Sequence, residues 1–406
     1  MKEDTPLVAI IGAGPGGTTC AAMLNKLGIK SFIIERTTFP RFAVGESLLP
    51  VSLDHFKEAG LLGAVEKMHF IKKPGGVFHN GLKKTRIHFS DTMNLDFDHA
   101  FSMPRSAFDF ALSEEVEAQG IEILWNTCLE KGHLQGGMWT LDLVEGDTKR
   151  SVKVDWVVDA SGKALLVDAK EKAQQKVQAE DPRGAIFAHL KDARRPDGFD
   201  GLATWVLTNE SQTWGWIIPI TNELASVGFI DLKSNIHEEG ENDEAAYRRL
   251  LALFSPTRER FSDVEFARPP KSAFGFKKAI IKPSGEGYCL VGNSLGFLDP
   301  VLSSGIALAT ESAIRSAKGI QAMFSSTGFD WEKEYDAPLL EGINVFSGCV
   351  ETWYDGTLGS LLHSDAQKPA SIVTRMTSIL AGGAWDSENF LTRDSAEKFR
   401  FLNRSA

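Results

Sequence analysis

The sequence lacks the long apolar segments, basic tracts and export signals that would assign it to a membrane, to nucleic acid or to the cell exterior. No stretch approaches the roughly 18 consecutive apolar residues that a membrane helix requires. Residues 1–6 run directly into an apolar segment, without the charged and apolar regions of a signal peptide. Lys and Arg number 44 against 54 Asp and Glu, for a formal charge of -10, and no run of five basic residues occurs. We therefore expect a cytoplasmic protein that binds neither membrane nor nucleic acid.

Cysteine and histidine are sparse and form no metal-binding or redox pattern. The four cysteines, Cys20, Cys128, Cys289 and Cys349, lie far apart, and the nine histidines have no zinc-ligand spacing. We expect neither disulfides nor a metal site, as suits a reducing compartment. The sequence also lacks internal repeats, and its 406 residues, 43% of them hydrophobic, suffice for two or three domains.

The most specific local pattern is a glycine-rich turn near the N-terminus. Gly12, Gly14 and Gly17 follow an apolar strand predicted at 7–11 and open a helix predicted at about 16–27. The next predicted strand, 31–35, ends on Glu35. These residues allow a tight turn, close approach of a pyrophosphate and close helix packing, and the glutamate can accept from ribose hydroxyls. The pattern predicts a dinucleotide-binding unit, with a purely structural turn as the alternative, and does not choose between FAD and NAD.

Further along the chain the patterning changes between helical and extended. A helix is predicted at 106–119 and a strand at 121–125, followed by alternating apolar residues over 138–158. The region 184–274 is rich in short apolar runs typical of an antiparallel sheet. A strand predicted at 287–291 is followed by a helix predicted at 304–323, the same order of elements as in the N-terminal unit. The remaining residues are predicted to be mostly helical.

Three later segments distinguish FAD from NAD as the cofactor. These are Phe39 to Pro50, Arg105 to Asp109, and Val291 to Pro300 followed by Ser303 to Ile306. Over residues 7 to at least 315 the chain resembles the flavin-dependent halogenases, within the FAD-dependent aromatic-hydroxylase class. Weaker similarity to the same family continues at Trp353-Tyr354 and 380–386.

The resemblance implies an α/β fold, in which a Rossmann-type FAD-binding domain carries an inserted antiparallel substrate sheet and a C-terminal helical region. The implied FAD-binding domain is 1–78 with 101–165 and 280–340, the substrate domain is 79–100 with 166–279, and a helical lid spans 341–406.

The resemblance also assigns residues to FAD. Arg41 and Arg105 would lie along the cofactor, Asp299 and Pro300 beside the ribityl chain and pyrophosphate, and Gly305-Ile306 at the flavin ring. A helix opening there would direct its positive end at the reduced ring. The full implied set is Gly12, Gly14, Gly17, Glu35, Arg36, Arg41, Glu46, Ser47, Arg105, Asp159, Asn293, Asp299, Pro300, Gly305 and Ile306. Gly292-Asn293 departs from the family's frequent Gly-Asp, but asparagine can still bond a ribityl hydroxyl.

The reaction follows from the same resemblance. In halogenases FADH2 from a separate flavin reductase reacts with oxygen, halide attacks the C4a-hydroperoxide, and hypohalous acid travels through a tunnel to a lysine. The residues Trp214, Trp216, Ile218 and Pro219 match the family's WxWxIP motif, which separates the flavin and substrate chambers.

Two residues are candidates for the active lysine. The family's spacing from Phe70 to Gly75-Gly76 selects Lys73 over Lys72, and two solvated loop lysines are the alternative. A lysine ammonium can bond hypohalous acid or, when its pKa is lowered, form a haloamine. Ser304 and Gly305 match the family's halide position, where backbone N–H groups would bind chloride or bromide. An ordinary N-cap serine is the alternative there.

The expected class of substrate follows from the absence of a glutamate base. Tryptophan halogenases carry a glutamate before the Ser/Thr pair, whereas this chain has Leu302 before Ser303. We therefore expect an electron-rich phenol or pyrrole, free or tethered to a carrier protein. Trp353, Tyr354 and Trp385 are expected in the core or as a roof over the substrate.

Two alternatives remain open. Gly292-Asn293, Trp353 to Gly356 and Ala384 to Asp386 resemble halide-independent FAD monooxygenases that hydroxylate a tryptophan of a partner protein during quinone-cofactor maturation. The third interpretation is a non-catalytic flavin-binding accessory protein.

Overall fold

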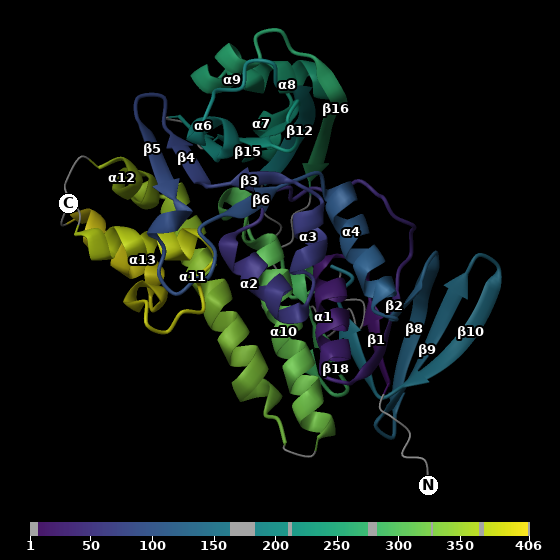
Figure 1. Cartoon of the computed structure of the whole chain (residues 1–406). Helices are drawn as coiled ribbons and strands as arrows, with labels where there is room; N and C mark the ends of the chain where they lie inside the picture. Colours follow the sequence, from purple (N-terminus) through teal and green to yellow (C-terminus); the bar gives the residue numbers. More distant parts are fainter. Residues whose placement is uncertain are drawn as a thin grey trace.

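Two large sheets organise the chain. The computed structural model describes residues 7–162, 183–209, 213–274, 282–325, 328–364 and 369–404. Within these, one six-stranded sheet is mainly parallel and one seven-stranded sheet is mainly antiparallel. Figure 1 shows the antiparallel sheet above the parallel one, with a three-stranded sheet on one side and the C-terminal helices on the other. This arrangement confirms the predicted fold class.

The parallel sheet forms around the N-terminal strand. β1 pairs in parallel with β2 and with β11, and Val8 to Ile11 are almost fully buried because helices and a second sheet cover both faces. The predicted strand at 7–11 is therefore confirmed. The strands in order are β17 (Ser284–Gly285), β18 (Tyr288–Leu290), β11 (Trp156–Asp159), β1 (Leu7–Ile11), β2 (Lys30–Ile34) and β7 (Glu122–Leu124).

One face of this sheet carries helices and the other carries a meander. The long helix α10 runs beside α1, and α2 and α4 also contact α1. The helices are α1 (Pro15–Lys26), α2 (Pro50–Ala59), α3 (Leu62–Lys67), α4 (Arg105–Ala118) and α10 (Ser304–Phe324). The meander consists of β8 (Thr127–Gln135), β9 (Met138–Glu145) and β10 (Thr148–Val154). Its alternating residues Trp139, Leu141 and Leu143 join the same core.

The seven-stranded sheet has two apolar faces. In β14 the side chains of Trp214, Trp216 and Ile218 lie in one core and Ile217 in the other, as the period of two requires. The strands in order are β16 (Phe266–Phe274), β12 (Arg183–Lys191), β15 (Leu224–Leu232), β14 (Trp214–Pro219), β13 (Thr204–Thr208), β4 (Gly75–His79) and β5 (Lys84–His88). The outer face is covered by α6 (Phe199–Leu202), α7 (Lys233–Ile236), α8 (Asp243–Leu251) and α9 (Ser255–Arg260).

The inner face meets the C-terminal helices, which are α11 (Ala337–Tyr354), α12 (Thr357–His363), α13 (Ala370–Leu380) and α14 (Ser395–Arg404). Trp385 packs on α11, where Gly342 leaves room for its ring: an added Cβ would lie 2.1 Å from it. The indole N–H donates to the Pro338 carbonyl at 3.1 Å. Trp353 is thus buried in the core, and Trp385 is partly buried against it.

The division into domains stays a prediction. Its boundary between 78 and 79 falls inside β4, which lies wholly in the seven-stranded sheet, and its boundary between 340 and 341 falls inside α11. The boundaries at 165/166 and 279/280 lie outside the described residues.

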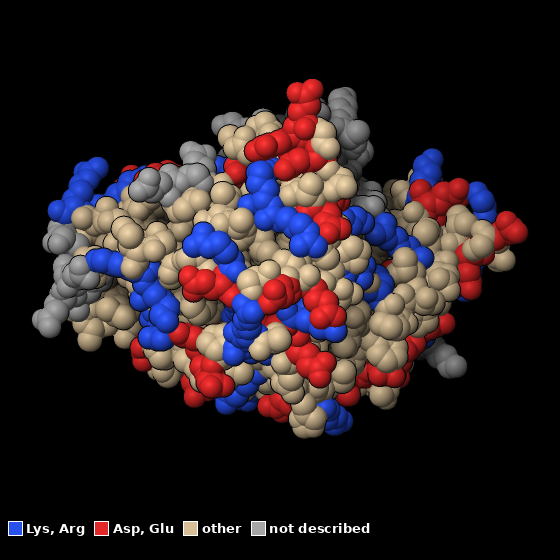
Figure 2. All heavy atoms as spheres, turned by 90° about the horizontal axis from the view of Figure 1, so that it is seen from above, with Lys and Arg blue, Asp and Glu red and all other residues tan. Residues whose placement is uncertain are grey.

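Charges on the upper face are interspersed. Figure 2 shows acidic and basic side chains next to one another over the described residues visible there. Exposed ion pairs of the described residues include Arg194 with Asp263 and, within α8, Arg248 with Glu244. None of the described helices is both long and apolar enough to cross a membrane.

A buried histidine–glutamate contact joins α2 to α10. His55 Nε2 lies 2.7 Å from Glu311 Oε2, and His55 Nδ1 lies 2.8 Å from the Thr310 hydroxyl. Arg315 also contacts Glu311. Burial alone would raise the pKa of Glu311, but the bond and charge of His55 and the charge of Arg315 outweigh it and lower that pKa to about 2.

We expect Glu311 to make the free energy of unfolding depend on pH in the acidic range. Its folded pKa is below the ordinary value of 4.5, so its contribution is complete above that value and is lost as the pH falls towards about 2. Glu311→Gln should cost about 2 kcal/mol at neutral pH and show a smaller further loss at about pH 3 than the unmodified protein. Urea unfolding at both pH values measures this. Glu244→Gln, in an exposed pair, is the matched control, and equal acid losses in Glu311→Gln and the unmodified protein would contradict the expectation.

Candidate functional site

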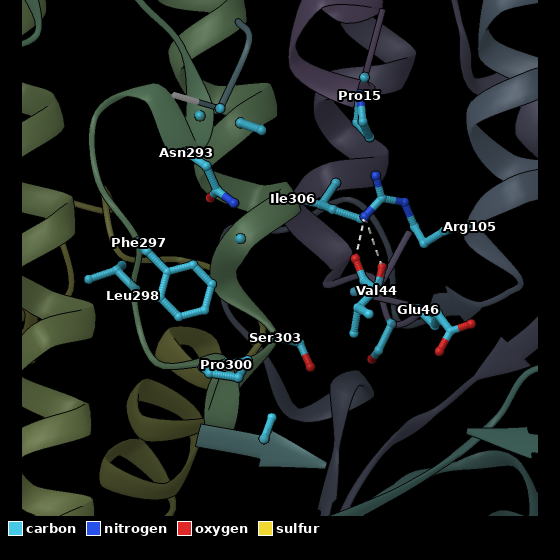
Figure 3. Close-up of a pocket in the computed structure, with 18 of the residues that line it drawn as sticks. Pro15, Val44, Glu46, Arg105, Asn293, Phe297, Leu298, Pro300, Ser303 and Ile306 are labelled. Carbon is cyan, nitrogen blue, oxygen red and sulfur yellow. Dashed lines mark hydrogen bonds between the residues drawn. The ribbon is translucent and has the colours of Figure 1, made fainter. Parts of the chain in front are cut away.

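A large cavity opens between the two sheets. It has a volume of about 380 Å³ and lies at the carboxyl ends of β1, β11 and β18, where the ligands of open α/β sheets bind. Its lining comes from residues 14–16, 44–47, 160–162 and 291–293, from inner-face side chains of β12 to β15, and from the segment leading into α10. Figure 3 shows Phe297 and Pro300 on one side of it, and Val44, Glu46 and Arg105 on the other.

The glycine turn fits a dinucleotide. Gly12 has φ +103°, and an added Cβ would lie 2.7 Å from the Ala160 carbonyl oxygen. At Gly17 an added Cβ would lie 1.9 Å from the Gly12 carbonyl oxygen. α1 begins directly after Gly14 with no acidic residue in its first turn and no side-chain cap. Its free N–H groups therefore suit a pyrophosphate, so the residues present fit the predicted cofactor.

Glu35 stabilises the glycine turn through hydrogen bonds. Its Oε2 accepts from the Ala13 N–H at 2.9 Å, and its Oε1 accepts from the Thr37 N–H at 3.0 Å and the Thr37 hydroxyl at 2.9 Å. A carboxylate keeps further acceptor capacity, so these bonds leave room for a ribose hydroxyl. Arg36, next in the chain, is exposed.

Arg105 holds the loop on the opposite side of the cavity. Its Nη1 donates to the Val44 carbonyl at 2.8 Å, and its Nε and Nη2 donate to the fully buried Asp109 at 2.8 and 3.0 Å. Arg41 Nη2 lies 3.6 Å from the same carboxylate. Figure 3 shows the Arg105 side chain reaching the loop at Val44. The two arginines therefore shape this wall while presenting positive charge near the expected pyrophosphate.

The N-terminus of α10 faces the same space. Ser303 takes the left-handed conformation with φ +57°, and this turns the chain from the short helix Pro300–Leu302 into α10. Ser303, Gly305 and Ile306 line the cavity, whereas Ser304 is buried and is not among the lining residues. The first-turn N–H groups lack helical partners and favour a nearby anion.

Trp214 and Trp216 form the wall towards the antiparallel sheet. The ring of Trp216 fits over Gly228, its partner in β15, where an added Cβ would lie 2.3 Å from the indole. Trp214 Nε1 donates to the Tyr354 hydroxyl at 3.0 Å, and that hydroxyl donates to Asp299 Oδ2 at 2.7 Å. Burial and the Asp299 carboxylate raise the pKa of Tyr354 far above its usual range, so the phenol stays protonated.

Lys73 lies beside a second, small cavity. Its Nζ donates to the Ser47 hydroxyl at 2.8 Å and to the Leu48 carbonyl at 2.9 Å, and burial lowers its pKa to about 7. Lys72 points to the surface. The small cavity, of about 40 Å³, is lined by Leu49, Lys73, Gly76, Phe78, Ile87, Phe89, Thr204, Val206, Val301, Leu302, Ser303 and Leu380.

The two cavities share a partition. Thr204, Val206, Val301 and Ser303 border both of them. Buried Lys73 is therefore one layer of side chains away from the large cavity.

The structure brings most predicted site residues to the large cavity. Those that line it are Gly14, Arg41, Glu46, Ser47, Arg105, Trp214, Trp216, Ile218, Asn293, Pro300, Gly305 and Ile306. Those that do not are Gly12, Gly17, Glu35, Arg36, Lys73, Asp159, Pro219, Asp299 and Ser304. Asp159 supports the lining instead, since its Oδ1 accepts from the Ser161 N–H and from the Ser294 hydroxyl.

Several lining residues were missed from the sequence. Val44, Phe297 and Leu298 lie within the quoted motifs and could have been included. Phe187 and Thr204 come from strands of the inserted sheet. Their residue types and spacing carry no signal of their own.

Known proteins are similar to the chain over most of its length. A family model described as "FAD binding domain" matches residues 5–326. The 1H-pyrrole-2-carbonyl-(peptidyl-carrier protein) brominase of Pseudoalteromonas luteoviolacea is 28% identical over 336 residues, covering 81% of this chain and 80% of that protein. The corresponding chlorinase of Pseudomonas fluorescens is 28% identical over 392 residues, covering 87% and 84%. A solved flavoprotein/dehydrogenase from Cytophaga hutchinsonii superposes with a TM-score of 0.92 at 31% identity, covering 98% of each chain.

We expect Gly17→Ala to weaken FAD binding at least about tenfold, because the added methyl would collide with the Gly12 carbonyl and displace the turn. Titration of the apoprotein with FAD measures the affinity, and circular dichroism checks the fold. Gly63→Ala in α3 is the control, since no atom lies within 4 Å of its added Cβ. Equal affinities in the two variants would show that the turn does not hold the cofactor.

Proposed function

Because the chain belongs to the FAD-binding domain family and, within it, to the flavin-dependent halogenases, we propose that it uses FADH2, dioxygen and a halide ion to halogenate an electron-rich aromatic substrate. The observation that carries the proposal is Lys73, buried beside a small cavity that a thin partition divides from the large one.

Bound in the large cavity, FADH2 together with dioxygen would supply the oxidant that converts chloride or bromide to hypohalous acid. The chain's own residues prepare that site. The N-termini of α1 and α10 and the side chains of Arg41 and Arg105 supply positive potential for the anionic parts of the cofactor. The backbone at Ser304 and Gly305 would supply N–H groups to the halide. Trp214, Trp216 and Ile218 keep the substrate away from the flavin.

Lys73 would direct the oxidant to the substrate. One N–H of its ammonium donates to the oxygen of hypohalous acid. The ring carbon bonds to the halogen as the halogen–oxygen bond breaks, and the departing hydroxide takes a proton from Lys73 to become water. The proton displaced from the ring then passes to the neutral amine and restores the ammonium. A pKa near neutrality suits both transfers.

The small cavity supports an electron-rich substrate. No carboxylate lines it within the described part of the chain, and Leu302 occupies the wall instead. The ring must therefore react without a carboxylate base, as a phenol or pyrrole can. Two relatives are named for a pyrrole bound to a carrier protein, which supports a carrier-tethered substrate here.

Space next to Lys73 is limited. About 40 Å³ holds a molecule of a few atoms, whereas benzene occupies a cavity of roughly 150 Å³ in an engineered protein. Phe78 lines this space, and the ring of Trp353 packs edge-on against Phe78 with centroids 6.0 Å apart. The substrate would reach Lys73 by displacing side chains on this side, consistent with the predicted roof.

The direct test supplies the protein with FAD, a flavin reductase, NADH and either bromide or chloride. We expect halogenation of a β-diketone trap that depends on both oxygen and halide. Flavin reoxidation without trap halogenation, with a partner protein gaining one oxygen atom, would favour the hydroxylase alternative. No flavin turnover at all would favour the accessory-protein alternative.

We expect Lys73→Ala to form hypohalous acid at an unchanged rate while product formation falls at least about a hundredfold, because the group that holds the oxidant is missing. Trap halogenation and product mass are measured side by side with a phenol or pyrrole substrate. Lys72→Ala, which removes the exposed neighbour, should keep both activities. Loss of product in Lys72→Ala but not in Lys73→Ala would reverse the assignment.

We expect product formation to fall as the pH rises through about 7, where the Lys73 ammonium loses its proton. Hypohalous acid formation, measured with the trap, should lack this inflection. The inflection should also be missing from the residual activity of Lys73→Ala. An inflection common to product and trap would place the titrating group at the flavin instead.

A further inference from the structure

The Lys73 ammonium has one N–H without an acceptor among the described residues. Two of its three N–H bonds are taken, by the Ser47 hydroxyl at 2.8 Å and the Leu48 carbonyl at 2.9 Å. Lys73 and Phe89 both line the small cavity, and Nζ lies over the Phe89 ring, 5.1 Å from its centroid. The two acceptors therefore determine where the remaining donor lies.

Lys73 and Ser47 are both held in place by pairing with the same strand, β6. β3 (Ile71–Lys73) pairs with β6 (Ala100–Ser102), which places Lys73 opposite Ala100. Ser47 forms an isolated bridge to Ser102 on β6. Two backbone bonds, from Leu48 to Phe101 at 2.9 Å and from Met103 to Glu46 at 3.0 Å, fix this segment on each side of Ser47. The distance between Ser47 and Lys73 is thus set by sheet geometry rather than by side-chain contact alone.

The Ser47 hydroxyl is also held from the other side. It lies 3.2 Å from the Thr204 hydroxyl, and Thr204 belongs to the partition between the two cavities. Lys73, Ser47 and Thr204 are 3%, 4% and 6% exposed, so bulk water does not compete for these bonds. A hydroxyl fixed by a second hydroxyl presents its lone pair to the ammonium in a constant direction.

We propose that Ser47 is a positioning residue for Lys73, which fixes the ammonium so that its third N–H meets the oxidant as it crosses the partition. This rests on the proposed function, in which Lys73 receives hypohalous acid. Ser47 also lines the large cavity, so one residue contacts both the cofactor's chamber and the lysine. The Ser47 hydroxyl accepts from the charged form of Lys73 and therefore favours the ammonium over the amine.

The test measures the titration of Lys73 itself. In protein labelled with 13Cε-lysine, the Lys73 resonance is assigned by its loss in Lys73→Met, and its midpoint is followed with pH. We expect Ser47→Ala to lower the midpoint by roughly one pH unit, because the charged form loses an acceptor. Ser47→Thr keeps the hydroxyl and should restore the midpoint. Ser52→Ala, at a fully buried serine of α2 whose hydroxyl has no described hydrogen-bond partner, should not move it.

Turnover gives the second measurement. In Ser47→Ala the fall of product formation with pH should move to lower pH by the same amount, and Ser47→Thr should return it to its original position. An unchanged Lys73 midpoint in Ser47→Ala would overturn the positioning role. If the unmodified protein forms no hypohalous acid but the midpoint still shifts, the proposed function fails and the contact between Ser47 and Lys73 stands.

Discussion

The close approach of α1 to α10 is the constraint on which the site depends. Gly16 makes it possible: an added Cβ there would lie 2.8 Å from the Val291 side chain and 3.4 Å from the Ala309 carbonyl oxygen. With no side chain at this position, the two helices begin at the same cavity. Their unpaired N–H groups then face one ligand from two directions. A larger residue would separate the pyrophosphate end of the site from the end where the flavin ring is expected.

The seven-stranded sheet separates the large cavity from the small one. β14 presents alternate side chains to the large cavity, and β13 contributes Thr204 and Val206 to the partition that the small cavity shares. Because that partition is only one layer of side chains, the small uncharged oxidant of the proposed reaction would have a short path to Lys73. A bulky aromatic ring meets closely packed side chains. Burial of Lys73 lowers its pKa to about 7. In the proposed reaction the same burial would keep water away from the oxidant.

The sequence was informative where local chemistry dictates structure. The turn at Gly12 requires glycine for its φ and its packing, and the alternation in β14 places Trp214 and Trp216 on one face, so both were predictable. The contact of Ser47 with Lys73 was not, because it depends on two segments meeting on β6. The position of β4 in the antiparallel sheet was missed for the same reason: its pairing with β13 joins residues far apart in the sequence.

The Tyr354 hydroxyl links three parts of the chain, namely the end of α11, the Trp214 wall and the Asp299 segment that leads into α10. Cofactor and substrate regions are therefore not independent modules. Exchanging the C-terminal helices with those of a relative, a natural way to change the accepted substrate, would also remove a donor from Asp299 and an acceptor from Trp214. A chimera that keeps a tyrosine at the end of α11 would retain both hydrogen bonds, whereas one that loses it would leave Trp214 and Asp299 without the partner they share.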